Sequence, residues 1–147
     1  MRRQFLFLFA WLAATALMPL AANAAETHRL ALQVSDNDPD KMNAALNVAA
    51  NVSQYYSGKG QEVEIQVIAF NAGLHMLRDD TSPVKERLQS FAKGMPNVSF
   101  MACQNTLDNM TKREGKKPEI VKTATMVPSG AVTLIELSEK GWTIIRP

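Results

Sequence analysis

Five short apolar runs alternate along the chain with segments in which apolar residues recur at helical spacing. Alternating apolar residues predict a strand over 28–35, and the run Val67–Phe70 ends a second strand over 62–70. Shorter apolar runs predict three more strands, over 98–102, 123–127 and 142–145. Because helices are expected between consecutive strands, the chain is predicted to have an α/β, three-layer fold: a mostly parallel five-stranded sheet flanked by helices.

The starts of the helices are indicated by capping residues. Asp38 followed by Pro39 predicts one helix, and Ser82 followed by Pro83 predicts another, because each pair joins an N-cap side chain to a residue suited to the first helical position. The remaining expectations are a loop over 71–81, a helix starting at Asn105 or Thr106, a charged loop over 112–119, and a helix after Ser129. The last segment is rich in β-branched residues, so a strand is the alternative there.

The first 24 residues have the pattern of a cleaved export signal. Two arginines precede the uncharged apolar run 5–20, and Ala22-Asn23-Ala24 matches the small residues that a signal peptidase reads. The run is shorter than the roughly 20 apolar residues of a membrane-spanning helix, which favours cleavage over a retained anchor. The start Arg2-Arg3-Gln4-Phe5-Leu6 also resembles a twin-arginine signal, but the strongly apolar Phe/Leu run fits the general secretory route better. We therefore expect a periplasmic protein with one domain, residues 25–147, and no membrane attachment after cleavage.

The composition is that of a globular protein and excludes several other classes of protein. The chain has 147 residues, of which 46% are hydrophobic and one is cysteine, so a core is expected and a disulfide scaffold is excluded. Removal of Arg2 and Arg3 with the signal leaves 14 basic residues (16 minus 2) against 14 acidic ones. This balance argues against nucleic acid as a partner, because phosphate binding needs a concentrated basic surface.

Polar residues follow several of the predicted strands. In an open α/β sheet the ligand crevice lies beyond the carboxyl ends of the strands, so these residues are the candidates for a site. The set comprises Asp36, Asn37, Asn71, Gly73, His75, Cys103, Asn105 and Ser129. Polar residues are common in loops in any case, so their grouping is weak support by itself.

Cys103 is the strongest candidate for chemistry. It follows an apolar strand and precedes a predicted helix, where amide donors and the helix dipole favour a thiolate, the form that attacks or carries sulfur. The alternative is a small buried hydrophobic residue at the end of a strand. His75 is a candidate proton acceptor or positive partner of that thiolate, and a solvated loop histidine is its alternative.

Other chemistries have weaker support. Six methionines of the mature chain, with His75 and Cys103, raise the possibility of a copper carrier, but their scattered spacing favours core packing. The positive excess of residues 112–118 is better explained by a solvated loop than by an anion-binding patch. The sequence has no phosphate-binding glycine loop, HExxH or GxSxG motif, and no cofactor or metal is expected.

Three blocks of sequence together resemble one known family. They are 67–74 (VIAFNAGL), 100–107 (FMACQNTL) and the ending 127–147, which contains VPSG and GWTIIRP. With the first strand and its Asp/Asn loop, these blocks are similar to the DsrE/DsrF-like proteins, in particular their exported single-domain branch. The likeness covers about residues 29–147.

This resemblance implies a parallel α/β sheet of flavodoxin-like topology, assembled as a homo-oligomer, a trimer or a hexamer. It also implies that Cys103 matches the cysteine that carries a persulfide in sulfur-relay members, which hand the sulfur to a partner protein. The export signal is a departure, because the familiar relay partners are cytoplasmic. The sequence therefore predicts a sulfur carrier with a donor or acceptor protein as its partner. The alternative is a noncatalytic binding or assembly module with an inert Cys103.

Overall fold

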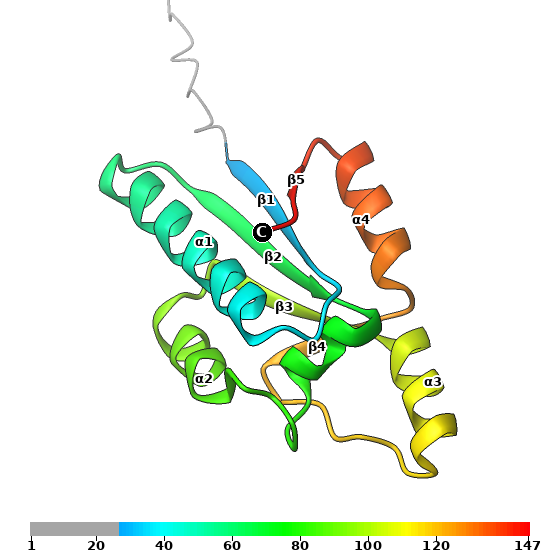
Figure 1. The fold of residues 1–147 in the computed structure, drawn as a ribbon. Helices are drawn as coiled ribbons and strands as arrows, with labels where there is room; N and C mark the ends of the chain where they lie inside the picture. Colours follow the sequence, from blue (N-terminus) through cyan, green and yellow to red (C-terminus); the bar gives the residue numbers. More distant parts are fainter. Residues whose placement is uncertain (1–26) are drawn as a thin grey trace, which may run out of the picture.

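The chain folds around a five-stranded, fully parallel sheet with helices on both faces (Figure 1). The computed structural model describes residues 27–147, so the expected export signal lies outside the described residues. The strands are β1 (His28–Val34), β2 (Val63–Ala69), β3 (Val98–Cys103), β4 (Ala124–Val127) and β5 (Thr143–Ile145). The three-layer α/β fold predicted from the sequence is confirmed.

The strand order is β4-β3-β2-β1-β5. It differs from the 2-1-3-4-5 order of flavodoxin, which the family resemblance implied. The difference arises because the first three connections all step in the same direction across the sheet, and only the last one returns to the far side of β1. Since parallel crossovers are right-handed, this reversal puts the helix before β5 on the opposite face from the helices after β1 and β2.

The helix α1 (Pro39–Gly58) starts as its capping residues predict. The Asp38 carboxylate accepts hydrogen bonds from the backbone N–H groups of Asp40 at 2.9 Å and Lys41 at 3.4 Å, and Pro39 occupies the first turn. The face that carries Met42 and Leu46 is fully buried against the sheet. Together, capping and the apolar stripe fix this helix over β1 and β2.

The segment 71–81 is more ordered than the predicted loop. Residues Asn71–Leu77 form a 3₁₀-helix, η1, and its apolar residues Leu74, Met76 and Leu77 are all buried in the core. The next helix, α2 (Lys85–Gly94), starts later than the Ser82-Pro83 pair suggests. The Ser82 hydroxyl accepts from the Val84 amide at 3.3 Å, and thus shapes the turn ahead of the helix.

The helix α3 (Gln104–Glu114) is longer than predicted at both ends. It starts directly after Cys103, not at Asn105 or Thr106, and it continues through the first part of the expected loop. Gly115 ends it in the left-handed conformation, with φ of 69°, and its N–H bonds to Thr111 at 2.9 Å. The buried side chains of α3 belong to the same core cluster as those of η1, and the two elements contact each other.

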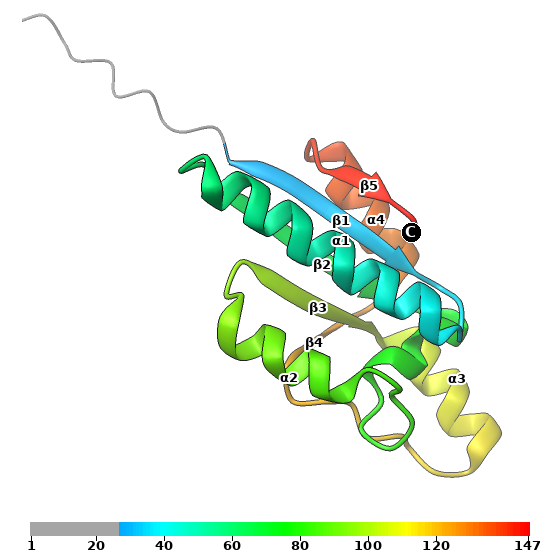
Figure 2. The same cartoon turned by 60° about the vertical axis from the view of Figure 1, so that its left-hand side comes forward.

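The helix α4 (Gly130–Glu139) confirms the helix, rather than the strand, after Ser129. Its buried residues Leu134 and Leu137 pack with Trp142 on one face of the sheet. The helices α1 and α2 cover the other face, where the main core lies (Figures 1 and 2). Between residues 27 and 147, none of the helices has the length and apolar character needed to cross a bilayer.

Candidate functional site

A cavity of about 640 Å³ opens at the carboxyl ends of the strands, between η1 and α3. We refer to it as the carboxyl-end cleft. Its polar lining residues are Asn37, Asn71, His75, Thr106, Asn109, Lys112 and Arg113. Asn37, Asn71 and His75 were candidates from the sequence, so the fold brings three of the predicted site residues to one cavity.

The η1 wall of the cleft is pressed against the end of β1. A Cβ atom on Gly73 would lie 2.2 Å from the carbonyl oxygen of Val34, so only glycine fits there. Asn71 adopts a positive φ of 50°, and its backbone N–H donates to the Thr106 hydroxyl of α3 at 3.0 Å. Gly73 was expected to bind a ligand. In the structure it is buried, and its backbone packs closely against the backbone of Val34.

Arg78, directly after η1, ties the two walls of the cleft together. Its buried guanidinium donates to Asp80 at 2.7 Å and to Glu114, in the last turn of α3, at 2.6 Å. These hydrogen bonds hold the pKa values of the Asp80 and Glu114 carboxyls below their usual range, and they raise the pKa of Arg78. Arg78 therefore fixes the end of η1 to the end of α3.

His75 is a half-buried lining residue of the cleft. Its Nδ1 atom lies 2.8 Å from the Thr81 hydroxyl, which orients the ring. Across the described residues, Nε2 of His75 makes no hydrogen bond. The ring is thus anchored through Nδ1, and Nε2 has no partner among residues 27–147.

Cys103 does not line this cleft. It is the last residue of β3 and the N-cap of α3, and only 4% of its surface is exposed. Strand alternation puts its side chain on the same face as Met101, the face covered by α4. The structure therefore does not bring the two candidate catalytic residues, Cys103 and His75, to one cavity.

The other candidates from the sequence make contacts that connect segments of the fold. Asp36 pairs with Lys41 at 2.8 Å and with Arg146 at 2.9 Å, and these partners lower the pKa of its carboxyl. The backbone N–H of Asn105 donates to the Pro128 carbonyl at 3.2 Å. Ser129 is the N-cap of α4, where its backbone carbonyl accepts from the Thr133 amide at 2.9 Å.

Among the lining residues that were not sequence candidates are Asn109, Lys112 and Arg113. Lys112 and Arg113 were missed because the charged segment was expected to be a loop from residue 112, whereas α3 continues to Glu114. The spacing Thr106, Asn109, Met110 and Arg113 is the signal that could have identified them, because residues three and four apart share one face of a helix.

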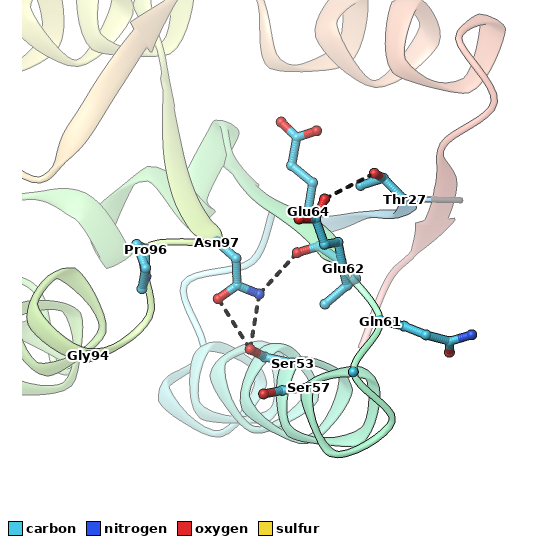
Figure 3. Close-up of a pocket in the computed structure, with 11 residues that line it drawn as sticks. Thr27, Ser53, Ser57, Gln61, Glu62, Glu64, Gly94, Pro96 and Asn97 are labelled. Carbon is cyan, nitrogen blue, oxygen red and sulfur yellow. Dashed lines mark hydrogen bonds between the residues drawn. The ribbon is translucent and has the colours of Figure 1, made fainter. Parts of the chain in front are cut away.

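A second cavity, of about 730 Å³, lies at the amino ends of the strands (Figure 3). We refer to it as the amino-end pocket. Asn97 faces Ser53 of α1 there, donating to its hydroxyl at 3.0 Å and to the Val63 carbonyl at 3.1 Å. Glu62 and Glu64 also line it, so its charged lining is acidic.

No family model and no curated protein matches the chain. Among solved structures, the chain is similar to a protein of unknown function, MTH1491 from Methanobacterium thermoautotrophicum. The TM-score is 0.68 at 23% sequence identity, over 82% of this chain and 99% of that one. The two proteins share a fold. The match therefore supports the α/β architecture, and function has to be argued from the site.

The described part of the chain offers no conventional metal centre. Among residues 27–147, no three side chains of the types His, Cys, Asp and Glu gather where they could hold an ion. Several methionines that entered the copper hypothesis, including Met42, Met76 and Met110, are buried in the core cluster. Their positions are those of packing residues.

Proposed function

We propose that the protein is an exported, homo-oligomeric DsrE-like protein that carries sulfane sulfur as a persulfide on Cys103. The observation that carries this proposal is the position of Cys103 as the N-cap of α3 at the end of β3, with no cap hydrogen bond from its side chain. The first amide groups of a helix stabilise negative charge, and both the thiolate and the persulfide anion are negative.

A second helix start lies close to the same point. The Asn105 amide in the first turn of α3 donates to Pro128 at 3.2 Å, and Pro128 precedes the N-cap of α4. The side chain of that N-cap, Ser129, makes no capping hydrogen bond. The starts of α3 and α4 therefore lie side by side near Cys103, and the free amides of the first turn of α3 support an anionic sulfur there.

The chemistry requires one nucleophilic substitution at sulfur. The Cys103 thiolate attacks a terminal sulfur of a polysulfide, a new S–S bond forms on the protein, and the S–S bond behind the attacked atom breaks. The products are the Cys103 persulfide anion and a polysulfide dianion shorter by one sulfur. A thiolate of an acceptor protein then removes the outer sulfur in the same way, and no external oxidant is needed.

The test is intact mass measurement of the native protein after exposure to inorganic polysulfide. We expect a gain of one or more sulfur atoms in the wild type, removed by dithiothreitol, and no gain in Cys103→Ser. Cys103→Ser should keep the circular dichroism spectrum and the unfolding midpoint near those of the wild type, because a hydroxyl is close in size to a thiol. An unmodified wild type under native conditions, when the same protein gains sulfur in urea, would rule out the carrier.

A second candidate function is a noncatalytic binding or assembly module with an inert Cys103. Two observations favour it: Cys103 is a buried residue, 4% exposed, and the carboxyl-end cleft is formed without it. Buried thiols react slowly with alkylating reagents until the protein unfolds. Alkylation of Cys103 by iodoacetamide only in denaturant would support the module, and alkylation of the native protein would support the carrier.

A further inference from the structure

We propose that the carboxyl-end cleft binds a small polar organic anion, whose carboxylates are held by Lys112 and Arg113. This inference goes beyond sulfur transfer on Cys103 and is independent of it, because Cys103 does not line the cleft. The volume of about 640 Å³ is in the range of small-molecule sites.

The positive charge of the cleft is not neutralised from within the fold. Lys112 and Arg113 are exposed at the end of α3, and neither pairs with a carboxylate of residues 27–147. The carboxylate next in sequence, Glu114, is already bound to Arg78 at 2.6 Å. Arg78 thus occupies the Glu114 carboxylate, and Lys112 and Arg113 remain available to a ligand.

The amide side chains of the cleft are also unoccupied. Within the part of the chain that the structure describes, the side chains of Asn37, Asn71 and Asn109 make no hydrogen bond to another residue. Each amide group offers donors as well as an acceptor. These groups suit a ligand that carries hydroxyl or carbonyl groups besides its negative charge.

The walls of the cleft are held in place before a ligand arrives. The Arg78 bonds and the hydrogen bond from the Asn71 amide to Thr106 join η1 to α3. Close packing of Gly73 against Val34 fixes η1 to the sheet. A preformed site loses little conformational entropy on binding, which favours affinity.

The experiment is isothermal titration calorimetry on the chain without residues 1–24, with citrate and succinate as anionic probes and inositol as an uncharged one. We expect at least one of the two acids to bind and inositol not to bind. Chemical-shift mapping by NMR should place the bound acid at the side-chain amides of Asn71 and Asn109. Absence of binding by both acids at millimolar concentration, or equal binding of inositol, would overturn the proposal.

A matched pair of double variants separates specific binding from general attraction. Lys112→Ala with Arg113→Ala removes two positive charges from the cleft, and Lys116→Ala with Lys117→Ala removes two from the adjacent loop. We expect the first pair to weaken binding about tenfold or more and the second to change it less than about twofold. Equal weakening by both pairs would contradict a defined site.

The same titration with Cys103→Ser distinguishes this proposal from the proposed function. Cys103 lies outside the cleft, so this variant should bind the acids as the wild type does. Acid binding without polysulfide modification would leave the cleft proposal intact while the carrier fails, and modification without acid binding would do the reverse.

Discussion

The two ends of the sheet carry cavities of similar size that use their polar groups in opposite ways. At the amino end, the Asn97 side chain hydrogen-bonds to the Ser53 hydroxyl and donates to the Val63 carbonyl, and these bonds join the end of α1 to the starts of β2 and β3. At the carboxyl end, the Asn71 and Asn109 side chains have no partner among residues 27–147. The charges differ too, with Glu62 and Glu64 at one end and Lys112 and Arg113 at the other.

This difference distinguishes a structural cavity from a candidate binding site. The amino-end pocket is the larger of the two, but its Asn97 amide and Ser53 hydroxyl bond to each other and stabilise the fold. The carboxyl-end cleft is smaller, yet the side-chain amides of Asn71 and Asn109 make no hydrogen bond to residues 27–147. Parallel α/β folds place ligands beyond the carboxyl ends of their strands, which agrees with this assignment.

Among the predicted changes, Gly73→Ala, at the carboxyl end of the sheet, should lower the free energy of unfolding the most. The new methyl group would lie 2.2 Å from the Val34 carbonyl oxygen, and the backbone of η1 or β1 would have to move. We expect the free energy of unfolding to fall by about 3 kcal/mol or more, measured by urea denaturation.

The matched control for this change is Gly58→Ala at the amino end. A Cβ atom on Gly58, the last residue of α1, meets nothing within 4 Å. We expect a change within about 1 kcal/mol, in the stabilising direction, because alanine favours a helix. Similar losses for the two variants would show that the tight contact of η1 with β1 does not matter.

A smaller loss is expected for Arg78→Ala, which removes the tie between the walls of the cleft. The buried side chain and its bonds to two carboxylates are lost, so we expect the free energy of unfolding to fall by about 2 kcal/mol. Lys85→Ala, which removes the exposed pair with Asp79 at 2.9 Å, should cost less than about 1 kcal/mol. Citrate binding should weaken in Arg78→Ala and remain unchanged in Lys85→Ala.

At acidic pH, the difference in the free energy of unfolding between the wild type and Arg78→Ala should become smaller. Arg78 holds the pKa values of Asp80 and Glu114 below their usual range, so its stabilising effect is complete above about pH 5. It is lost as the pH falls through the lowered pKa values, below about pH 4, because the carboxylates become protonated in the folded protein. Unfolding curves measured from pH 7 to pH 3 check this, and a difference that grows toward low pH would contradict the assignment.

The smallest effect expected is that of Asn97→Ala in the amino-end pocket. The variant loses hydrogen bonds to Ser53 and to the Val63 carbonyl, so we expect the free energy of unfolding to fall by about 1 to 2 kcal/mol. Citrate binding should stay as in the wild type, because the two cavities lie at opposite ends of the strands. Gln61→Ala, at an exposed lining residue without such bonds, should change neither quantity. A loss of citrate binding in Asn97→Ala would remove the distinction between the two ends.

The sequence predicted the helices and strands well where local chemistry decides them. Asp38 and Pro39 start α1 as expected, and the apolar runs mark all five strands. The sequence did not predict η1. Its three apolar residues, Leu74, Met76 and Leu77, are too few to show a helical repeat, and they become buried only when the sheet is present. Strand order is equally invisible in local patterns, since it depends on which strands pair.

The candidate site was predicted in part for the same reasons. Asn37, Asn71 and His75 were found because they follow strands, and strand ends meet at one edge. Gly73 was interpreted as a ligand-binding residue, although the close approach of the Val34 carbonyl explains why a glycine is needed there. Lys112 and Arg113 were missed because the end of α3 depends on Gly115, three residues beyond the position where the charged loop was expected to begin.

The parallel pairing of β1 with β5 has a practical consequence for labelling. His28 opens β1 at one pole of the molecule, whereas Arg146, bound to Asp36, lies at the other pole. A fluorescent reporter on Thr27 would therefore sit beside the acidic pocket, and one on Pro147 would sit next to Asp36, at the carboxyl end of the sheet. The two reporters would mark opposite ends of the sheet within one molecule.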